Sequence, residues 1–447
     1  MNTEETKKAL LELLLHGSDE DLNREIEHIH PADILDILHD DEEYLTTILK
    51  RLPDSFVADI IDEEDEEEKY EILKTLSENK QSDVLKEMSS DELTDLVGAL
   101  EEDEVETVLD MMTPQDREDV TQLLSYNPET AGGIMATEFT TIWENKTVIK
   151  TIEFLQETSE DFQTSYYLFV TDSTGILKGV ISLRDLVSTP FDTLISTITN
   201  PNVISLDVNM DQEEVARKFE KYGFVTMPVV DEGNHMLGIV TVDDVMEIIQ
   251  DENTEDIHQL GGISGEERVD GTLAESIKSR LPWLMVNLLT AILAASVVGM
   301  FEATIAKVVA LATIMPIVTG MGGNAGTQSL TIVVRGIALG ELTGENAWRI
   351  FVKECGVGVV TGIVIGGIIA VIGMLFQGNA MFGIVTGLAM LMNMIAATIA
   401  GYFVPLTLKR MNIDPALASA VFVTTVTDVL GFFFFLGLAT VFIGYLI

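Results

Sequence analysis

Five long apolar stretches follow one another after residue 280. They run at about 282–301, 304–333, 355–376, 381–408 and 416–446. A helix needs roughly 20 apolar residues to cross a bilayer, so this pattern predicts a membrane domain of five transmembrane helices at 279–447. With a cytoplasmic N-terminus, every basic residue flanking these spans except Lys307 falls on the cytoplasmic side. The positive-inside rule therefore predicts a multi-pass protein of the cell membrane with an external C-terminus.

A repeat of 12 residues runs through residues 41–124, with blocks such as PDSFVADIIDEE and SSDELTDLVGAL. Three of the seven blocks, SSDELTDLVGAL among them, end with an acid, two apolar residues and a further apolar residue three positions on, and the other blocks share part of this pattern. Each such unit forms a short helix with one apolar edge, and only stacking against neighbours buries that edge. The repeat predicts an acidic, all-α superhelical domain at 1–130.

A second repeat has a period of 59 residues. YYLFVTDSTGILKGVISLRDLV (166–187) aligns without gaps to VTMPVVDEGNHMLGIVTVDDVM (225–246). Each copy reads as strand, turn, strand and helix start, and an amphipathic helix precedes each. This pattern resembles a tandem pair of CBS domains, which predicts an α/β region at 131–250, divided at about 138–198 and 199–250.

The resemblance also bears on nucleotide binding. In CBS domains the acid that opens the last helix often contacts a nucleotide ribose, and Asp185 and Asp244 match that place. Asp185 and Asp243 are the candidate nucleotide residues, with ATP as the candidate ligand. The alternative is that these acids are plain helix caps.

Charge divides the chain into two parts. The formal net charge is -47, from 73 acidic and 26 basic residues, yet residues 281–447 hold only six of each. The first 280 residues therefore hold 67 acids and 20 bases. Such an excess argues against nucleic acid or anionic lipid as partner and favours cations. The single Cys355 excludes a disulfide framework, and the N-terminus lacks a signal-peptide pattern.

Asp428 stands far from either end of the last apolar stretch. A charge at that depth costs roughly 2.5–3.5 kcal/mol on insertion scales, so it needs a cavity, a partner or an ion. No basic side chain lies at comparable depth, and Thr424, Thr425 and Thr427 add hydroxyl oxygens. Carboxylate, hydroxyl and carbonyl oxygens suit a hard cation. The alternative is a packing aspartate hydrogen-bonded to a neighbouring helix.

The second apolar stretch contains GMGGNAGTQS (320–329), a composition typical of a loop. Pro316 removes a helix hydrogen bond and the glycines loosen the next turn, so a broken helix lining a wet path is predicted here. Glycine-mediated helix packing is the competing interpretation, although it leaves Asn324, Thr327 and Gln328 unexplained.

These residues resemble the MgtE family of magnesium transporters and channels. Its pore motif is a proline followed by Gly-Asn-x-Gly-x-Gln, and its last helix carries Asp-x-x-Gly; here these are Pro316, residues 323–328, and Asp428 with Gly431. The resemblance implies a homodimer with a Mg²⁺ pore between the subunits. It implies the pore residues Asp428, Asn324, Thr424, Gly320 and Gly431, and the motif residues Pro316, Gly323, Gly326 and Gln328.

The resemblance also implies closure by cytosolic Mg²⁺ through a linker or plug helix at 244–278. In the sequence, Asp244, Glu247, Asp251 and Glu255 share one helical face. The family's regulatory acids correspond to Asp244, Glu247, Glu252, Glu255 and Asp256, and further to Asp59, Asp91, Asp95 and Glu213.

Two other functions remain open from sequence. One is transport of another divalent cation such as Co²⁺ or Mn²⁺, and the other is a CBS-regulated membrane sensor without transport. A membrane enzyme or ATP-driven pump is disfavoured, because the sequence lacks a P-loop, a H-E-x-x-H motif and a G-x-S-x-G motif.

Overall fold

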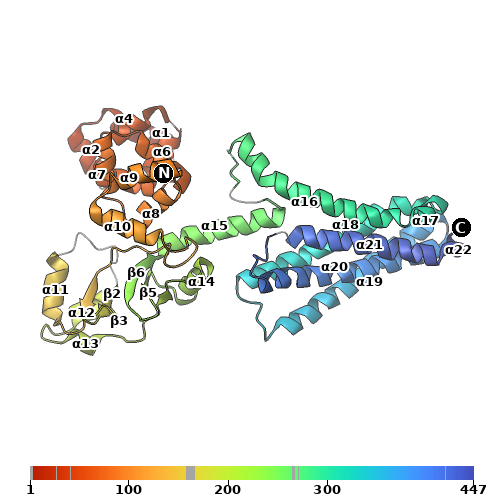
Figure 1. The fold of residues 1–447 in the computed structure, drawn as a ribbon. Coiled ribbons are helices and arrows are strands. Elements are labelled where there is room, and N and C mark those ends of the chain that lie inside the picture. The colour runs from red at the N-terminus through yellow and green to blue at the C-terminus, as the bar shows by residue number, and fades with distance from the viewer. Residues whose placement is uncertain are drawn as a thin grey trace. The chain divides into compact units, whose positions relative to one another are not determined.

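The computed structural model describes residues 4–26, 28–40, 42–157, 167–263, 267–269, 271–417 and 419–447. The chain divides into two compact units, Met1–Ile248 and Ile249–Ile447 (Figure 1). Each unit is described by itself.

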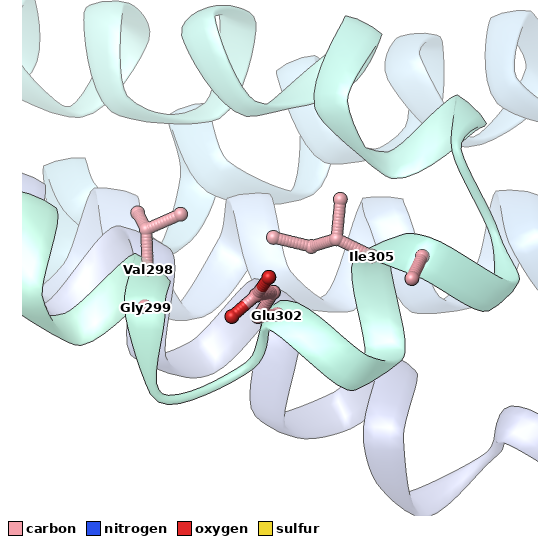
Figure 2. A pocket seen from close by; sticks show the side chains of 5 residues that line it. Val298, Gly299, Glu302 and Ile305 are labelled. Atoms are coloured by element: carbon pink, nitrogen blue, oxygen red, sulfur yellow. The ribbon is translucent and has the colours of Figure 1, made fainter.

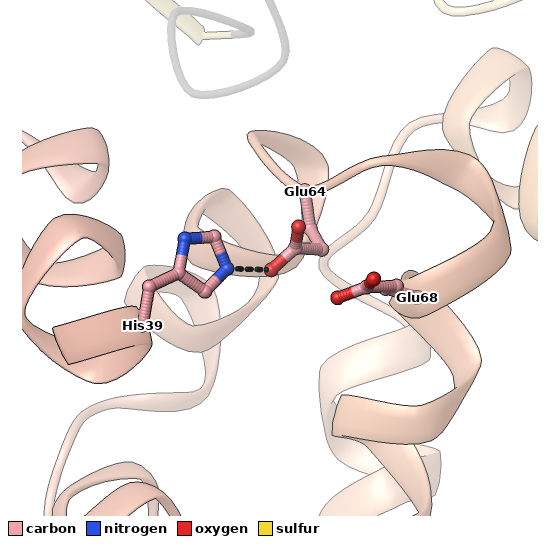
Figure 3. Close-up of side chains that lie close together, drawn as sticks. All are labelled: His39, Glu64 and Glu68. Atoms are coloured by element: carbon pink, nitrogen blue, oxygen red, sulfur yellow. Dashed lines mark hydrogen bonds and ion pairs between the residues drawn. The ribbon is translucent and has the colours of Figure 1, made fainter. Parts of the chain in front are cut away.

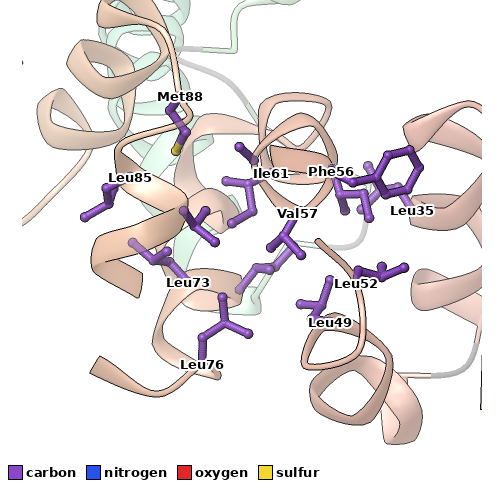
Figure 4. Close-up of a cluster of buried hydrophobic side chains, with 14 of the residues drawn as sticks. Leu35, Leu49, Leu52, Phe56, Val57, Ile61, Leu73, Leu76, Leu85 and Met88 are labelled. Atoms are coloured by element: carbon purple, nitrogen blue, oxygen red, sulfur yellow. The ribbon is translucent and has the colours of Figure 1, made fainter. Parts of the chain in front are cut away.

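The first unit begins with a stack of short helices. They are α1 (Glu4–His16), α2 (Asp19–Ile26), α3 (Pro31–Asp40), the 3₁₀ turn η1 (Glu42–Tyr44), α4 (Leu45–Leu49), α5 (Asp54–Asp62), α6 (Glu66–Lys74), α7 (Glu78–Leu85), α8 (Ser90–Gly98), α9 (Glu102–Leu109) and α10 (Pro114–Leu123). From α5 to α10 each helix begins 12 residues after the previous one, which confirms the predicted helical repeat. Helices two apart contact each other, as α5 does α7 and α6 does α8. Their apolar edges meet in one core that includes Val57, Leu73 and Leu85 (Figure 4).

Two β-α-β-β-α modules follow. The first contains β1 (Thr141–Trp143), α11 (Val148–Glu157), β2 (Tyr167–Thr171), β3 (Leu177–Ser182), α12 (Leu183–Ser188) and the short α13 (Ile195–Ile198). The second contains β4 (Leu206–Asp207), α14 (Gln212–Tyr222), β5 (Thr226–Val230), β6 (Met236–Thr241) and α15 (Val242–Gly261).

The two modules repeat each other in detail. In each, the first strand pairs in parallel with the second and the second pairs antiparallel with the third. The second strand, the third strand and the helix after them start 59 residues apart in the two modules. The antiparallel register shifts at Val170/Thr171 and again at Val229/Val230. The modules also pack together, because Leu177 N–H donates to Asn234 O at 2.9 Å. The predicted tandem CBS fold is confirmed.

The second unit is a helical bundle. Its helices are α16 (Leu273–Gly299), α17 (Glu302–Lys307), α18 (Ala310–Ala338), α19 (Ala347–Gln377), α20 (Ala380–Arg410), α21 (Ser419–Val441) and α22 (Ile443–Leu446). α20 lies at the centre, in contact with α18, α19 and α21. Buried side chains such as Phe382, Met390 and Phe435 fill the space between these helices.

Five long helices agree with the predicted helical membrane domain. Among the described residues, four are both long and apolar enough to cross a membrane: Leu273–Gly299, Ala347–Gln377, Ala380–Arg410 and Ala420–Val441. The fifth, α18, is long enough at 29 residues, but Asn324, Thr327 and Gln328 make it less apolar.

The predicted break in the second membrane segment is wrong. α18 runs without interruption from Ala310 to Ala338, with Pro316 inside it. Proline removes one helix hydrogen bond, and the remaining bonds hold the helix. The competing interpretation, glycine-mediated packing, accounts for Gly322 and Gly326, which are buried against neighbouring helices.

Candidate ion path and regulatory carboxylates

Asn393 lies at the junction of α18, α20 and α21. Its side chain is fully buried, and Nδ2 donates to the Val318 carbonyl on α18 at 2.9 Å. A Cβ on Gly322 would lie 2.1 Å from that nitrogen, and one on Gly431 would lie 2.8 Å from it. Both glycines therefore make room for one amide. Sequence reasoning missed Asn393, although a lone asparagine in an apolar helix was the available signal.

The motif on α18 divides between two faces of the helix. Gly322 and Gly326 face the bundle, whereas Pro316, Gly320, Asn324 and Gln328 recur every four residues on the exposed face. An amide facing lipid at membrane depth is costly, so this polar face requires water or another protein surface. These four positions are exposed in the single chain.

Asp428 is half-buried on α21. Among the described residues, none forms a hydrogen bond or ion pair with its carboxylate. This observation disfavours the packing interpretation. A Cβ on Gly323 of α18 would lie 3.9 Å from Thr427 Oγ1 of α21. Gly323 and Thr427 directly precede Asn324 and Asp428 in the chain, so the two helices face each other at this level.

The threonines beside Asp428 use their hydroxyl protons within α21. Thr424 Oγ1 donates to Ala420 O at 2.9 Å, Thr425 Oγ1 to Val421 O at 2.6 Å, and Thr427 Oγ1 to Thr424 O at 2.9 Å. A hydroxyl that donates its proton keeps two lone pairs. The oxygens therefore remain available as cation ligands, and their orientation is fixed by the helix.

Glu354 is a second carboxylate within the bundle, and sequence reasoning missed it. It is only 2% exposed. It lies inside α19, which begins at Ala347, eight residues before the predicted span. Ser329 Oγ on α18 donates to Oε2 at 2.7 Å, and Lys353 Nζ lies 3.2 Å from Oε1. Glu354 is thus paired and joins α18 to α19, unlike Asp428.

The second half of α15 packs on the helices that carry the candidate path. Leu260 packs against buried residues of α18 and α21, among them Leu330 and Val423. Arg335 Nη1 donates to Asn253 Oδ1 at 3.2 Å. Burial, then the charges of Asp414 and Glu252, raise the pKa of Asp256 to about 6. Three acids therefore crowd together where α15 meets the bundle, and Asp414 was not predicted.

A second group of acids lies in the first unit, where α8 meets the CBS pair. Ser90 Oγ donates to Glu138 Oε2 at 2.7 Å and anchors this contact. Next to it, burial and the charge of Asp91 raise the pKa of Asp244 to about 6. Burial also raises the pKa of Asp91, which is 9% exposed. Two of the predicted regulatory acids therefore face each other.

Three residues that were not predicted complete this group. Lys69 on α6 is buried and pairs with Glu92 on α8. Asp62 on α5 has a buried Oδ1 without a hydrogen-bond partner among the described residues. Burial and the charge of Glu92 raise the pKa of Asp62 well above its usual range. Four carboxylates and one ammonium group therefore lie near one another in this part of the first unit.

The other predicted acids have varied places. Asp59 is exposed on α5, where burial of part of its side chain and the charge of Glu63 raise its pKa. Asp95 on α8 lies near enough to Lys69 to affect it electrostatically. Glu213 is in the first turn of α14, 3.8 Å from Arg217. Glu247 and Glu255 are exposed on α15, and Glu252 is half-buried near Asp256.

The candidate nucleotide residues lie in the first turns of α12 and α15, where each contacts the hydroxyl residue just before its helix. Ser182 Oγ donates to Asp185 Oδ2, and Thr241 Oγ1 donates to Asp244 Oδ2, both at 2.6 Å. Thr241 Oγ1 also contacts Asp243. The equivalent acids Asp185 and Asp244 therefore each accept a hydrogen bond from the hydroxyl three residues earlier. Asp185 and Asp243 are exposed.

A small pocket in the second unit contains none of the predicted residues. Val298, Gly299, Glu302, Ile305 and Ala306 line it, between the end of α16 and α17 (Figure 2). Glu302 is its single charged group. One carboxylate with apolar neighbours offers too few ligands for a cation site.

Replacing Gly322 with alanine is expected to destabilise the bundle by about 1–3 kcal/mol, because the new methyl group must displace Asn393. The measurement is thermal unfolding in detergent. Gly367→Ala is the matched control, since a Cβ there would meet nothing within 4 Å. Equal unfolding midpoints for the two variants would contradict the proposed close packing.

Without divalent cations, the first unit is expected to lose stability as pH rises from about 5 to 8. Its raised carboxyl pKa values mean that the folded state holds protons which the unfolded state has released. Stability is therefore full below the unfolded pKa values, near 4, and falls as pH passes the folded value of about 6 for Asp244 and the raised value of Asp62.

Thermal unfolding of residues 1–263 in a chelator tests this slope. Asp244→Asn should flatten it. Asp172→Asn should not, because the hydrogen bond from Lys178 lowers the pKa of Asp172, so this group titrates at lower pH. A midpoint that rises with pH in the unsubstituted protein would refute the expectation.

Comparison with known families gives matches along most of the chain. Residues 29–129 match the family described as the MgtE intracellular N domain, and 131–191 and 195–251 match the CBS domain. Residues 315–438 match MgtE, described as a divalent cation transporter.

Individual relatives agree with these matches. The magnesium transporter MgtE of Thermus thermophilus is 36% identical over 441 residues, which cover 96% of this chain and 97% of that protein. The magnesium transporter MgtE of Enterococcus faecalis is 38% identical over 333 residues, 74% of this chain and 73% of that protein.

Two solved structures resemble the first part of the chain. The soluble part of a magnesium transporter has a TM-score of 0.53 at 36% identity and covers 56% of this chain and 98% of that one. The cytosolic domain of the Mg²⁺ channel MgtE in complex with ATP has a TM-score of 0.51 at 36% identity and covers 54% and 99%.

The fold and the gathered carboxylates define the class, an acidic membrane protein that combines a helical-repeat domain, a CBS pair and a helical bundle. The match to the Thermus thermophilus protein over nearly the whole of both chains places it further. The chain belongs to the MgtE family.

Proposed function

We propose that this protein moves Mg²⁺ across the cell membrane into the cytoplasm along a path formed by Asp428 and the polar face of α18. The observation that carries the proposal is the Asp428 carboxylate, which has no partner among the described residues of a chain 36% identical to a curated magnesium transporter. An unpaired carboxylate on a spanning helix is costly unless it serves an ion. Asn324 on α18, with Gly320, and Thr424 on α21, with Gly431, supply the other oxygens.

The path is completed by a second copy of the chain. The polar face of α18 is exposed, and so are apolar side chains along α16 such as Leu284, Leu288 and Ile292. A twofold axis beside α18 would cover both polar faces and bring two Asp428 carboxylates to one ion. Mg²⁺ gives up its water reluctantly, so carboxylates at such an axis hold the ion through its hydration shell.

Mg²⁺ at the acidic groups closes the path. Near the bundle, Asp256, Glu252 and Asp414 repel one another until a divalent cation bridges them, and the bridge holds α15 against α18 and α21. In the first unit, Asp91, Glu92, Asp62 and Asp244 are drawn together in the same way. A shift from mostly open to mostly closed needs about 5.5 kcal/mol of differential binding, which several weak sites can share.

The CBS pair also provides a place for ATP. A relative with this fold was solved in complex with ATP, and Asp185 and Asp243 are exposed at equivalent helix starts. Binding of ATP by the full chain, compared with Asp185→Asn, tests this part of the proposal.

Flux into proteoliposomes, followed with a magnesium-sensitive dye, tests the main proposal. Uptake should occur with a Mg²⁺-free lumen and should fall when the lumen contains millimolar Mg²⁺. Parallel assays with Co²⁺ and Mn²⁺ test transport of another divalent cation. Absence of uptake for all three ions would support the alternative of a membrane sensor.

A further inference from the structure

His39, Glu64 and Glu68 converge at a point in the N-terminal helical domain that none of the functions above uses. His39 is in the last turn of α3, Glu64 is in the turn between α5 and α6, and Glu68 is in the first turn of α6 (Figure 3). One ligand atom from each side chain lies within 4.8 Å of the other two. Among the residues that the structure describes, no other three His, Cys, Asp or Glu ligand atoms all lie within 4.8 Å of one another, so the acidic groups proposed for Mg²⁺ are more widely spaced.

Glu64 is held in place by its surroundings. Its side chain is only 4% exposed, although it is a carboxylate. Oε1 accepts a hydrogen bond from the Asp65 N–H at 3.1 Å, while Oε2 lies 2.7 Å from His39 Nε2. Burial of a carboxylate is unfavourable unless a positive group or hydrogen bonds compensate for it. The fold therefore fixes one oxygen and directs the other toward an imidazole.

The third ligand distinguishes this group from an ordinary His–Glu pair. Glu68 brings a second carboxylate to the same point, so that three ligand atoms lie within 4.8 Å of one another. His39 and Glu68 are exposed, so an ion can enter from solvent. The chain has a natural comparison in His235 and Asp231, a half-buried pair 3.0 Å apart.

The geometry points to a site for a first-row transition-metal ion, of which Zn²⁺ is the best fit, bound by His39 Nε2 and one carboxylate oxygen each from Glu64 and Glu68. A tetrahedral ion with bonds of about 2.0–2.2 Å places its ligand atoms roughly 3.4 Å apart, so small side-chain movements suffice. A mixed set of one imidazole and two carboxylates suits Zn²⁺, whereas Mg²⁺ prefers oxygen ligands alone. Three protein ligands leave one position for water.

The bound ion joins α3 to the α5–α6 turn. It replaces the hydrogen bond between His39 and Glu64 with two metal bonds, which requires the imidazole to be neutral. The site shares no residue with the carboxylates proposed for Mg²⁺.

Calorimetric titration of the full-length protein in detergent with Zn²⁺, in millimolar Mg²⁺, tests the assignment. His39→Ala and Glu68→Gln should each weaken one Zn²⁺-binding event by more than about tenfold, because even indirect ligand partners contribute 10- to 100-fold. His235→Ala should bind like the unsubstituted protein at this site. Glu68 is exposed, so its replacement leaves the fold intact.

Hydrogen exchange locates the event. Zn²⁺ should slow amide exchange in peptides covering α3 and residues 62–70 in the unsubstituted protein and in His235→Ala, but not in His39→Ala. Unchanged Zn²⁺ affinity in both His39→Ala and Glu68→Gln would overturn the proposal, as would protection that appears only elsewhere in the chain.

Discussion

Replacing Asp428 with asparagine is expected to lower Mg²⁺ flux into proteoliposomes by more than about tenfold. Asparagine keeps the size and the carbonyl oxygen of the side chain but removes its charge. At an effective dielectric constant of about 20, a unit charge 4 Å away contributes about 4 kcal/mol, so even partial loss of this attraction exceeds the 1.4 kcal/mol that a tenfold change requires. In a dimer the loss is doubled, because both copies change.

The position of Asp428 makes the result interpretable. Its carboxylate has no protein partner among the described residues, so the substitution breaks no hydrogen bond or ion pair there. The fold should therefore survive, as thermal unfolding can show. Glu302→Gln is the matched control, since it neutralises a carboxylate at the pocket beside α17. Normal flux in Asp428→Asn would remove the proposed path.

Local periodicity explains why much of the fold could be predicted. The 12-residue helical repeat and the 59-residue CBS repeat both place turn signals and apolar positions at fixed spacing, and the structure follows both. Thr113 is an example at a single residue. Its hydroxyl accepts a hydrogen bond from the Asp116 N–H and caps the start of α10. Short-range patterns specify elements and therefore predict repeated architectures well.

The path and the acidic groups depend on contacts between distant residues, which periodicity does not reveal. Pro316 and the glycine cluster suggest a break when α18 is considered alone, but Asn393, 71 residues after Gly322, occupies the space that the glycine leaves. Likewise Lys69, Asp62 and Glu92 resemble solvated surface charges in sequence, and only the stacking of α5, α6 and α8 brings them together. Burial by tertiary packing decides these roles.

Replacing Asp414 with asparagine is expected to reduce the closure of the path by Mg²⁺. Asp414 is the acid of the α20–α21 connection that acts on Asp256 of α15, so it both repels α15 without Mg²⁺ and helps to hold a bridging ion with it. Asparagine weakens the repulsion of α15 without Mg²⁺, and it weakens the binding of the bridging ion. Both changes make closure depend less on Mg²⁺. If several sites share about 5.5 kcal/mol, loss of one costs about 1–2 kcal/mol, a roughly 5- to 30-fold change in the open-to-closed ratio.

The measurement is proteoliposome flux at increasing lumenal Mg²⁺. Asp414→Asn should show a smaller difference between Mg²⁺-free and Mg²⁺-loaded vesicles, and Asp256→Asn should show the same. Glu345→Gln, an exposed acid in the connection between α18 and α19, should close like the unsubstituted protein. Closure unchanged in both aspartate variants would show that α15 is held on α18 and α21 by its apolar contacts, such as Leu260, and that Mg²⁺ acts elsewhere. The comparison therefore separates a charge-dependent contact from a permanently packed one.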